Sequence, residues 1–300
     1  MSYTLSLVAQ RDTTTLSNAV IAQVRDALGG GVPDILSVGE AADIPVDGAP
    51  RMDLVRAALG GAAIDAIPTQ SEGRRKSLLI ADMDSTIITG ETLDELADFA
   101  GLKQRIAAIT ARAMNGELDF KAALRERVAM LRGLPVDALE KTWQRIQLTE
   151  GARELVATMR AHGAFTALVS GGFTFFTGRV AAMVGFDLHR SNVLLDDGAT
   201  LTGRVAEPIL DRDTKLDTLT RLAAERGLPM SATLAVGDGA NDLDMLRAAG
   251  LGVPFPSALR RDGRPSRWSA PRPNFLSRNP RKQNFRTIDE EPRARGRFPR

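Results

Sequence analysis

Short apolar runs that end in polar residues recur through the middle of the chain. Each run has the length of a buried strand, and apolar residues at helical spacing follow it. The three runs are Leu78–Ala81, Ala164–Val169 and Ala232–Val236. Because strands that alternate with helices build parallel sheets, this pattern predicts an α/β fold with a Rossmann-like parallel sheet. Leu251–Val253 indicates the start of one further strand.

From Glu91 to Leu148 the pattern is helical throughout, with apolar stripes at helical spacing. This segment is inserted between the first and second strands of the predicted sheet. We therefore interpret residues 91–148 as a helical cap over the edge of the sheet, with a long helical crossover as the alternative. A cap that closes would exclude water and restrict which ligands enter.

Residues 1–72 show a different, smaller α+β pattern, which predicts a separate N-terminal domain. Its expected strands and helices follow one another in short order: strand Tyr3–Ala9, helix Thr15–Leu28, strand Ile35–Val38, helix Met52–Leu59 and strand Ala63–Ile67. Turns containing proline and glycine are expected between the second strand and the second helix. The polar and charged stretch Thr69–Lys76 is the expected linker to the domain over residues 73–253.

The last part of the chain, residues 254–300, has a composition of its own. It holds 13 lysines and arginines against 4 aspartates and glutamates, whereas the rest of the chain holds 26 against 33. Eight prolines interrupt it, and no periodicity survives, so we expect disorder. The abrupt change resembles a shifted reading frame, and a basic arm for nucleic acid is the alternative. The net charge of the whole chain is near neutral only because this basic segment offsets an acidic body. We therefore expect no specific nucleic-acid binding by the body of the protein.

Composition excludes several classes of chemistry. The chain has no cysteine, so disulfides, thiolate metal sites and thiol nucleophiles are absent. Its first residues lack a basic leader with a long apolar core, and no apolar run has the length of a membrane span. We therefore expect a cytoplasmic protein with no membrane association.

The ends of the predicted strands carry the residues that could do chemistry. Asp82 and Asp84 follow the first strand, Ser170 the second and Asp238 the third, while Lys215 lies in the first turns of a helical pattern. Ligands of open α/β sheets bind outside the carboxyl ends of strands, where these residues would meet. Carboxylates that could hold Mg²⁺ or attack phosphorus, together with hydroxyl, N–H and lysine donors, suit phosphoryl transfer. An ordinary Asp-rich turn is the alternative for Asp82 and Asp84 taken alone.

In these residues the chain resembles the haloacid dehalogenase (HAD) superfamily, and within it the phosphoserine phosphatase family. The resemblance covers roughly residues 75–253. Four motifs occur in the family's order: Asp82–Thr86, Ser170–Gly172, Lys215 and Gly237–Asp242. The resemblance implies Mg²⁺-dependent hydrolysis of O-phosphoserine to serine and phosphate, the last step of serine biosynthesis. Another small-molecule phosphatase or phosphotransferase of the superfamily is the nearest alternative, and a non-catalytic amino-acid sensor is a more distant one.

The resemblance also assigns roles to the strand-end residues. It implies that Asp82 is the nucleophile, forming an aspartyl-phosphate, and that Asp84 is the general acid and then the general base. It implies that Asp82, the backbone carbonyl of Asp84 and Asp238 hold Mg²⁺. Ser170 and the Gly171 N–H would bind phosphoryl oxygens.

The remaining implied roles concern charge, support and substrate choice. Lys215 would offset negative charge between Asp82 and the phosphate, Asn241 would lie on the substrate side, and Asp242 would support the metal. On the cap, the family positions for amino-acid recognition correspond to Glu91 for the ammonium group, Arg127 for the carboxylate and Phe120 as a shield. Residues 1–72 are similar in length and rhythm to the ACT regulatory domain of some members. A homodimer is possible.

Two further features are expected to lie outside the site. His162 precedes Gly163 at the end of a predicted helix, and we expect it and His189 to be bystanders. The stretch from Phe186 to Arg204 is predicted to be a hairpin that turns at Asp196-Asp197-Gly198.

Overall fold

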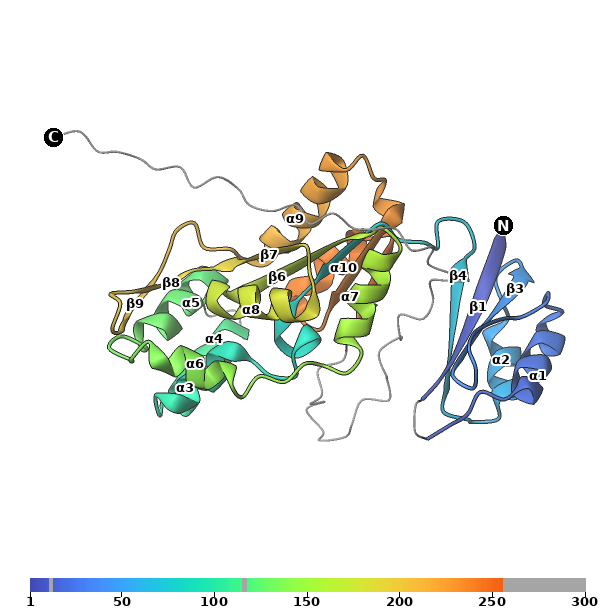
Figure 1. Cartoon of the computed structure of the whole chain (residues 1–300), viewed down its shortest axis with the longest axis horizontal. Coiled ribbons are helices and arrows are strands. Elements are labelled where there is room, and N and C mark those ends of the chain that lie inside the picture. The colour runs from blue at the N-terminus through green and yellow to red at the C-terminus, as the bar shows by residue number, and fades with distance from the viewer. Residues whose placement is uncertain (11–12, 115–117, 256–300) are drawn as a thin grey trace.

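A computed structural model describes residues 1–10, 13–114 and 118–255 of the chain (Figure 1). Its centre is a five-stranded parallel sheet in the order β11-β10-β5-β6-β7. The strands are β5 (Leu78–Ala81), β6 (Phe165–Phe173), β7 (Leu188–Asn192), β10 (Thr233–Gly237) and β11 (Leu251–Pro254). The three predicted runs form the three middle strands, so the predicted α/β fold with a parallel sheet is confirmed.

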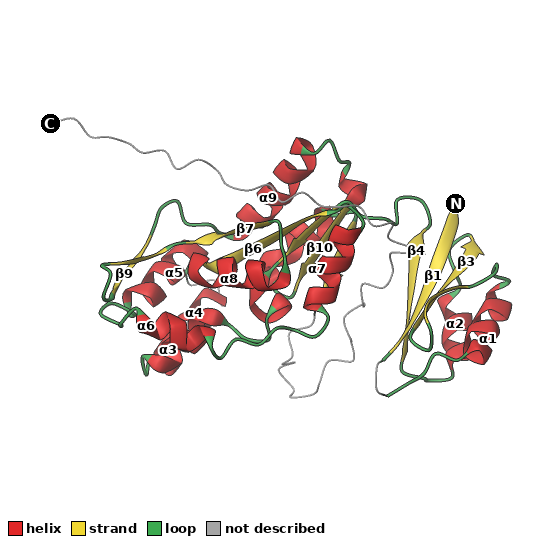
Figure 2. Ribbon diagram, viewed as in Figure 1, coloured by secondary structure: helices red, strands yellow, loops and turns green. Residues whose placement is uncertain are grey.

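Helices cover both faces of this sheet, as Figure 2 shows. Alternation along β5 explains why, because Leu79 and Ala81 enter one apolar core and Leu78 and Ile80 the other, all four without exposed surface. Burying a large aliphatic side chain stabilises a fold by roughly 1.5–3 kcal/mol. The covering helices are α7 (Ala152–Ala161) and α8 (Thr174–Val184) on the first face, and α9 (Arg212–Glu225) and α10 (Leu243–Ala248) on the second.

In its described residues the segment after β5 forms four helices, in keeping with the predicted helical pattern. They are α3 (Thr92–Phe99), α4 (Lys103–Met114), α5 (Phe120–Ala129) and α6 (Asp137–Trp143). An antiparallel bridge between Ile88 and Leu148 joins the two chain segments where this helical insertion leaves and re-enters the α/β unit. In Figure 1 the four helices gather at the end of the molecule opposite the N-terminal sheet.

The predicted hairpin over Phe186–Arg204 is wrong in its first half. Residues 188–192 form β7 and pair in parallel with β6, and only β8 (Leu194–Asp196) and β9 (Leu201–Val205) form a hairpin. β7 is an edge strand with the polar sequence Leu-His-Arg-Ser-Asn, which lacks the apolar run of its neighbours. The β8–β9 hairpin packs on the cap, where Gly203 lies close to the backbone of Ala129 and Arg132.

Residues 1–70 form an antiparallel sheet in the order β2-β3-β1-β4 with two helices on one face, a β-α-β-β-α-β arrangement. The elements are β1 (Ser2–Ala9), α1 (Asn18–Leu28), β2 (Asp34–Ser37), β3 (Ala41–Asp47), α2 (Met52–Leu59) and β4 (Ile64–Gln70). The sequence prediction missed β3 and placed turns there. Its alanines, aspartates and Pro45 have low strand propensity, and pairing with β1 along its whole length overrides that preference.

The expected linker is shorter than predicted, because Thr69 and Gln70 belong to β4 and pair with β1. Arg74 then contacts the N-terminal sheet, with its guanidinium 2.7 Å from the Asp43 carboxylate. Two residues later, the Lys76 ammonium donates to the backbone oxygen of Ser231 at 2.7 Å, in the short 3₁₀ turn η2 (Met230–Ala232) before β10. The linker therefore contacts the N-terminal sheet through Arg74 and the turn before β10 through Lys76.

At the other end, Pro254 is the last residue of β11, although the predicted tail begins there. The rest of the predicted disordered tail, from residue 256 onward, lies outside the described residues. Within the part of the chain that the structure describes, no helix has both the length and the apolar character needed to cross a membrane.

Candidate active site

Three neighbouring strands of the parallel sheet end beside one another and bring the predicted acids and hydroxyls together. The register aligns Ala81 of β5 with Val236 of β10 and with Leu168 of β6. The next residues along these strands lead to Asp82, Asp238 and Ser170. Parallel strands run in the same direction, so their carboxyl ends lie at one edge of the sheet. The structure places the three residues together at this edge, as the sequence predicts.

A buried ion-pair triad lies at the centre of this edge. The Lys215 ammonium is 2.8 Å from Asp82 Oδ1 and 2.6 Å from Asp242 Oδ1. Only 5%, 2% and 0% of the surfaces of Asp82, Lys215 and Asp242 are exposed. Buried charges are tolerated when they are paired and hydrogen-bonded, and here one cation serves two anions. The triad therefore keeps a surplus of negative charge.

Burial and the neighbouring charges shift the pKa values of Asp82 and Lys215. Burial raises the pKa of Asp82 to about 7 despite the nearby Lys215 ammonium, and Asp242 and Asp84 add to the increase. Burial alone would lower the pKa of Lys215, but the two carboxylates outweigh it and raise that pKa. Asp82 also accepts from the Met83 N–H at 2.8 Å through Oδ1. Among the described residues, every hydrogen bond and ion pair of the Asp82 carboxylate uses Oδ1, which leaves Oδ2 available.

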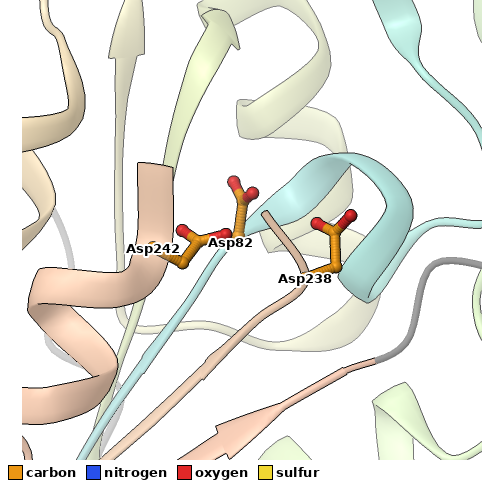
Figure 3. A group of neighbouring side chains, drawn as sticks. All are labelled: Asp82, Asp238 and Asp242. Atoms are coloured by element: carbon orange, nitrogen blue, oxygen red, sulfur yellow. The ribbon is translucent and has the colours of Figure 1, made fainter. Parts of the chain in front are cut away.

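A third acid, Asp238, completes a group of carboxylates that could hold a metal ion. Oxygen atoms of Asp82, Asp238 and Asp242 lie within 4.8 Å of one another, and Figure 3 shows Asp82 after β5, Asp238 after β10 and Asp242 at the start of the helical segment that follows. Asp242 has both oxygens occupied, because Oδ1 pairs with Lys215 and Oδ2 accepts from the Gly239 N–H at 3.0 Å. Asp242 thus connects Lys215 and the Gly239 N–H, whereas Asp82 and Asp238 keep carboxylate oxygens that could bind a metal ion.

This group fits Mg²⁺. The donors are all oxygens, which hard divalent cations prefer, and one lysine does not balance three carboxylates. Burial also raises the pKa of Asp238, although its hydrogen bond from the Thr86 hydroxyl at 3.1 Å opposes the increase. A divalent cation would stabilise the ionised form of these carboxylates, which burial and the neighbouring acids disfavour. The side chain of Asp84 is not part of the group, so that any contribution from Asp84 would come from its backbone carbonyl.

Asp84 lies in a tight turn, η1 (Met83–Ile87), in which Ser85 adopts a positive φ of 54°. Its Oδ1 accepts from the Thr92 N–H at 2.9 Å, and its Oδ2 accepts from the Ser170 hydroxyl at 3.2 Å. Burial raises the pKa of Asp84, while these hydrogen bonds from Thr92 and Ser170 oppose the rise. A carboxyl group held at both oxygens with a raised pKa is suited to carry a proton and release it.

The residues after Ser170 pack closely on Asp84, and a side chain at Gly172 would crowd it. A Cβ atom at Gly172 would lie 3.0 Å from Asp84 Oδ2 and 3.1 Å from Ser170 Oγ. Gly172 N–H donates to Ser170 Oγ at 2.9 Å, which orients that hydroxyl toward Asp84. The predicted strand stops at Val169, but β6 continues through both glycines to Phe173. The Ser170–Gly172 segment, which we call the Ser170–Gly172 loop, is therefore the end of a core strand.

The three residues predicted for amino-acid recognition lie in the helical insertion, Glu91 at its start and Phe120 and Arg127 on α5. Glu91 precedes α3 and accepts from the Ser85 hydroxyl at 2.7 Å. Although Glu91 is an exposed residue, its carboxylate is withdrawn from bulk water and lies near Asp84, and both effects raise its pKa to about 8. Arg127 of α5 is half-buried, which lowers its pKa, while the charges of Asp94 and Glu91 oppose that change. Among the described residues Arg127 forms no ion pair, and its Nε donates to the Ala123 carbonyl at 3.2 Å.

Phe120 links the cap to the loop after β6. A Cβ atom at Gly171 would lie 3.1 Å from the edge of the Phe120 ring, so the aromatic side chain packs directly on that glycine. A cavity of about 460 Å³ lies beside it, lined by Asp119, Phe120, Lys121, Asp211 and Asp213. Asp82 does not line this cavity, and only 5% of its surface is exposed.

One predicted residue stands apart. Asn241 lies in the 3₁₀ turn η3 (Ala240–Asp242) and is exposed, with its side chain folded over Gly239. The prediction also left out Thr86, Thr92 and Asn192, which hold Asp238, Asp84 and the Gly171 carbonyl respectively. Thr86 is the last residue of the first motif and could have been given a role there. Asn192 gives no signal in the sequence, because it ends a polar edge strand.

Comparison with known proteins agrees with this geometry. The model of the haloacid dehalogenase-like hydrolase family matches residues 79–247. A phosphoserine phosphatase from Archaeoglobus fulgidus is 44% identical over 188 residues, which cover 63% of this chain and 55% of that protein. The chain thus spans about half the length of this relative.

A shorter relative is covered more completely. A phosphoserine phosphatase from Streptococcus thermophilus is 46% identical over 180 residues, covering 60% of this chain and 84% of that protein. Among solved structures, a HAD-family hydrolase from Salmonella enterica subsp. enterica serovar Typhi superimposes with a TM-score of 0.70 at 29% identity. That match covers 84% of this chain and 89% of the other.

Proposed function

The chain belongs to the haloacid dehalogenase-like hydrolase family, and from this premise we propose that it hydrolyses O-phosphoserine to serine and phosphate through an aspartyl-phosphate on Asp82. The observation that carries the proposal is the buried Asp82–Lys215–Asp242 triad beside an Asp84 carboxyl held at both oxygens. The similarity to phosphoserine phosphatases supports the choice of substrate. The division into residues 1–72, 73–253 and 254–300, with a cap at about 91–148, is part of the same proposal.

In the first step, Asp82 Oδ2 attacks phosphorus and the bond to the serine oxygen breaks. The Lys215 ammonium and the Met83 N–H hold Oδ1, so the free oxygen has a fixed direction of approach. Asp84 gives its proton to the departing serine alkoxide, for which its raised pKa suits it. Such a positioned acid typically contributes about 10²–10⁴-fold to the rate.

In the second step, water attacks the phosphorus of the aspartyl-phosphate and the bond to Asp82 breaks. Asp84, now ionised, accepts the proton of that water and returns to its starting state. Ser170 and the Gly171 N–H would donate to the phosphoryl oxygens, and Lys215 would offset their charge. The two half-reactions therefore use the same acid–base group in opposite directions.

Mg²⁺ would be held by Asp82, Asp238 and the backbone carbonyl of Asp84, and when bound it would neutralise the charge of the phosphoryl group. Asp242 would hold the Lys215 ammonium and the Gly239 N–H in position around that site. Thr86 would orient Asp238 through its hydroxyl. Asn241, exposed at the start of the following helix, would lie on the substrate side.

The cap would select the amino-acid part of the substrate. Glu91 would accept hydrogen bonds from the substrate ammonium group, and Arg127 would pair with the substrate carboxylate. The contacts of Arg127 support this role, because among the described residues its guanidinium is not paired with a carboxylate. Phe120, packed on Gly171, would cover the phosphoryl site from the cap side.

Steady-state assays with Mg²⁺ on phosphoserine, phosphothreonine, phosphoethanolamine and a panel of sugar phosphates test this proposal. We expect the highest kcat/KM for phosphoserine, because only this ester and phosphothreonine offer both an ammonium and a carboxylate group. A sugar phosphate that is preferred over phosphoserine would contradict the substrate assignment while leaving phosphatase chemistry intact. Absence of turnover on every ester would favour a non-catalytic role.

A further inference from the structure

Asn192, the last residue of β7, is a buried polar residue with a side chain that joins two loops of the site. Only 2% of it is exposed. Its Nδ2 donates to the Gly171 carbonyl at 2.9 Å and to the Leu210 carbonyl at 3.2 Å, and its Oδ1 accepts from the Leu210 N–H at 2.8 Å. A buried amide is costly unless it is hydrogen-bonded, and here both of its polar atoms are engaged.

On one side, Asn192 fixes the peptide group between Gly171 and Gly172. The carbonyl of this peptide accepts from Asn192, and its N–H, which belongs to Gly172, donates to Ser170 Oγ. The Ser170 hydroxyl in turn donates to Asp84 Oδ2. Hydrogen bonds in such a chain polarise and align one another. Asn192 therefore anchors a continuous chain of hydrogen bonds that ends on the proposed acid–base group.

On the other side, Asn192 fixes the entry into α9. Leu210 directly precedes Asp211, which caps α9 in a capping box with Thr214. Lys215 is the next residue and reaches Asp82 and Asp242 from this first turn. The two hydrogen bonds between Asn192 and Leu210 thus set where the first turn of α9 begins.

We propose that Asn192 is a positioning residue of the phosphate site, which holds the Ser170–Gly172 loop at a fixed separation from the start of α9. The donors of this segment and the Lys215 ammonium are thereby kept close to the same phosphoryl group. Asn192 touches neither the substrate nor the reacting atoms. The inference rests on the proposed function in one respect, namely that this loop binds the phosphoryl group.

Isothermal titration of the full chain with inorganic phosphate in the presence of Mg²⁺ tests the proposal without turnover. We expect Asn192→Ala to weaken phosphate binding about tenfold, because the loop and α9 lose their common anchor. Asn192→Asp should weaken it at least as much. This isosteric variant keeps an acceptor for Leu210 N–H but loses both N–H donors and faces the Gly171 carbonyl with an oxygen.

Ser191→Ala is the matched control. Ser191 is the preceding residue of β7, is also buried, and hydrogen-bonds to the Thr177 hydroxyl of α8 at 2.7 Å, away from the phosphate loop. We expect it to lower the melting temperature while phosphate affinity stays within about twofold of the wild type. If circular dichroism shows that Asn192→Ala does not fold, the phosphate affinity of Asn192→Asp, which preserves side-chain volume, is compared with that of Ser191→Ala.

Inhibition by L-serine separates positioning from general damage. An aryl phosphate serves as the assay substrate, and the inhibition constant of L-serine should be unchanged in the Asn192 variants while that of phosphate rises. Equal losses for both inhibitors, or phosphate binding equal to that of Ser191→Ala, would overturn the proposal. A wild-type chain that binds phosphate but prefers another ester would contradict only the substrate assignment. A wild-type chain that does not bind phosphate would overturn both.

Discussion

The strand-end side and the cap side of the candidate site are held by different kinds of contact. On the strand-end side, Asp82, Lys215 and Asp242 are buried and joined by two ion pairs below 3 Å. On the cap side, Glu91 is exposed with one hydrogen bond from Ser85, and Arg127 bonds to one backbone carbonyl of its own helix. The strand-end side is thus already arranged for chemistry, whereas the cap side keeps charged groups available for a ligand.

One site can therefore hold the reacting groups rigidly on one side and keep adaptable groups for substrate recognition on the other. Preorganised dipoles and charges stabilise a transition state because they need no rearrangement during the reaction. Recognition of a substrate that must enter a nearly closed site needs parts that can move, and the cap is joined to the core at the Ile88–Leu148 bridge. Substitutions on the two sides should therefore change different kinetic constants.

The largest effect is expected for Asp82→Asn. Without a carboxylate nucleophile the covalent step is lost, and kcat should fall by at least about 10⁴-fold. The fold should persist, because Asp242 still pairs with Lys215. Asp137→Asn, which alters an exposed carboxylate on α6 paired with Lys141, is the control and should keep wild-type activity. Retention of more than a trace of turnover in Asp82→Asn would contradict the covalent route.

Asp84→Asn should reduce kcat for phosphoserine by about 10²–10⁴-fold, since it removes the acid–base group. The loss should be smaller for an aryl phosphate, because a phenolate leaves readily without a proton. Pre-steady-state kinetics with both esters measure this difference for the first step. A loss of the same size on both would show that Asp84 acts in another way, for instance by positioning Ser170.

Arg127→Ala tests the cap side. Because an ionic hydrogen bond to the substrate carboxylate is lost, KM for phosphoserine should rise roughly 10–100-fold, while kinetics on an aryl phosphate change little. Arg125→Ala is a matched control two residues away on α5, since Arg125 is exposed and pairs with Glu207 at 2.7 Å. Parallel losses on both substrates would instead indicate that Arg127 supports closure of the cap.

The smallest expected effect is a pH dependence from Glu91. Its pKa of about 8 lies above the ordinary value, so that below pH 8 the carboxyl is mainly neutral and binds an ammonium group less well. The ratio of kcat/KM for phosphoserine to that for an aryl phosphate should rise, up to about tenfold, as pH increases through about 8. Glu91→Gln should abolish this change. A ratio that is flat in the wild type would exclude Glu91 as the ammonium acceptor.

The two sides also differ in how well the sequence predicts them. Asp82, Ser170 and Asp238 could be placed together because each follows an apolar strand, and parallel strands end at a common edge. Lys215 needed only the additional expectation of a helix. By contrast, β7 and β3 escaped prediction, because their polar or alanine-rich sequences become strands only through pairing with neighbours. The role of Asn192 depends on β7 and therefore could not be predicted. The hydrogen bond from Thr86 to Asp238 could not be predicted either, because the two residues are 152 positions apart in the sequence.

The proposed covalent intermediate can be observed directly. Wild-type protein is mixed with phosphoserine carrying a labelled phosphoryl group, quenched in acid within milliseconds and digested, and the labelled peptide is identified by mass spectrometry. Our account predicts one acid-stable acyl-phosphate on the peptide that contains Asp82, absent from Asp82→Asn and longer-lived in Asp84→Asn. Turnover without any labelled peptide, or label on a residue other than Asp82, would contradict it.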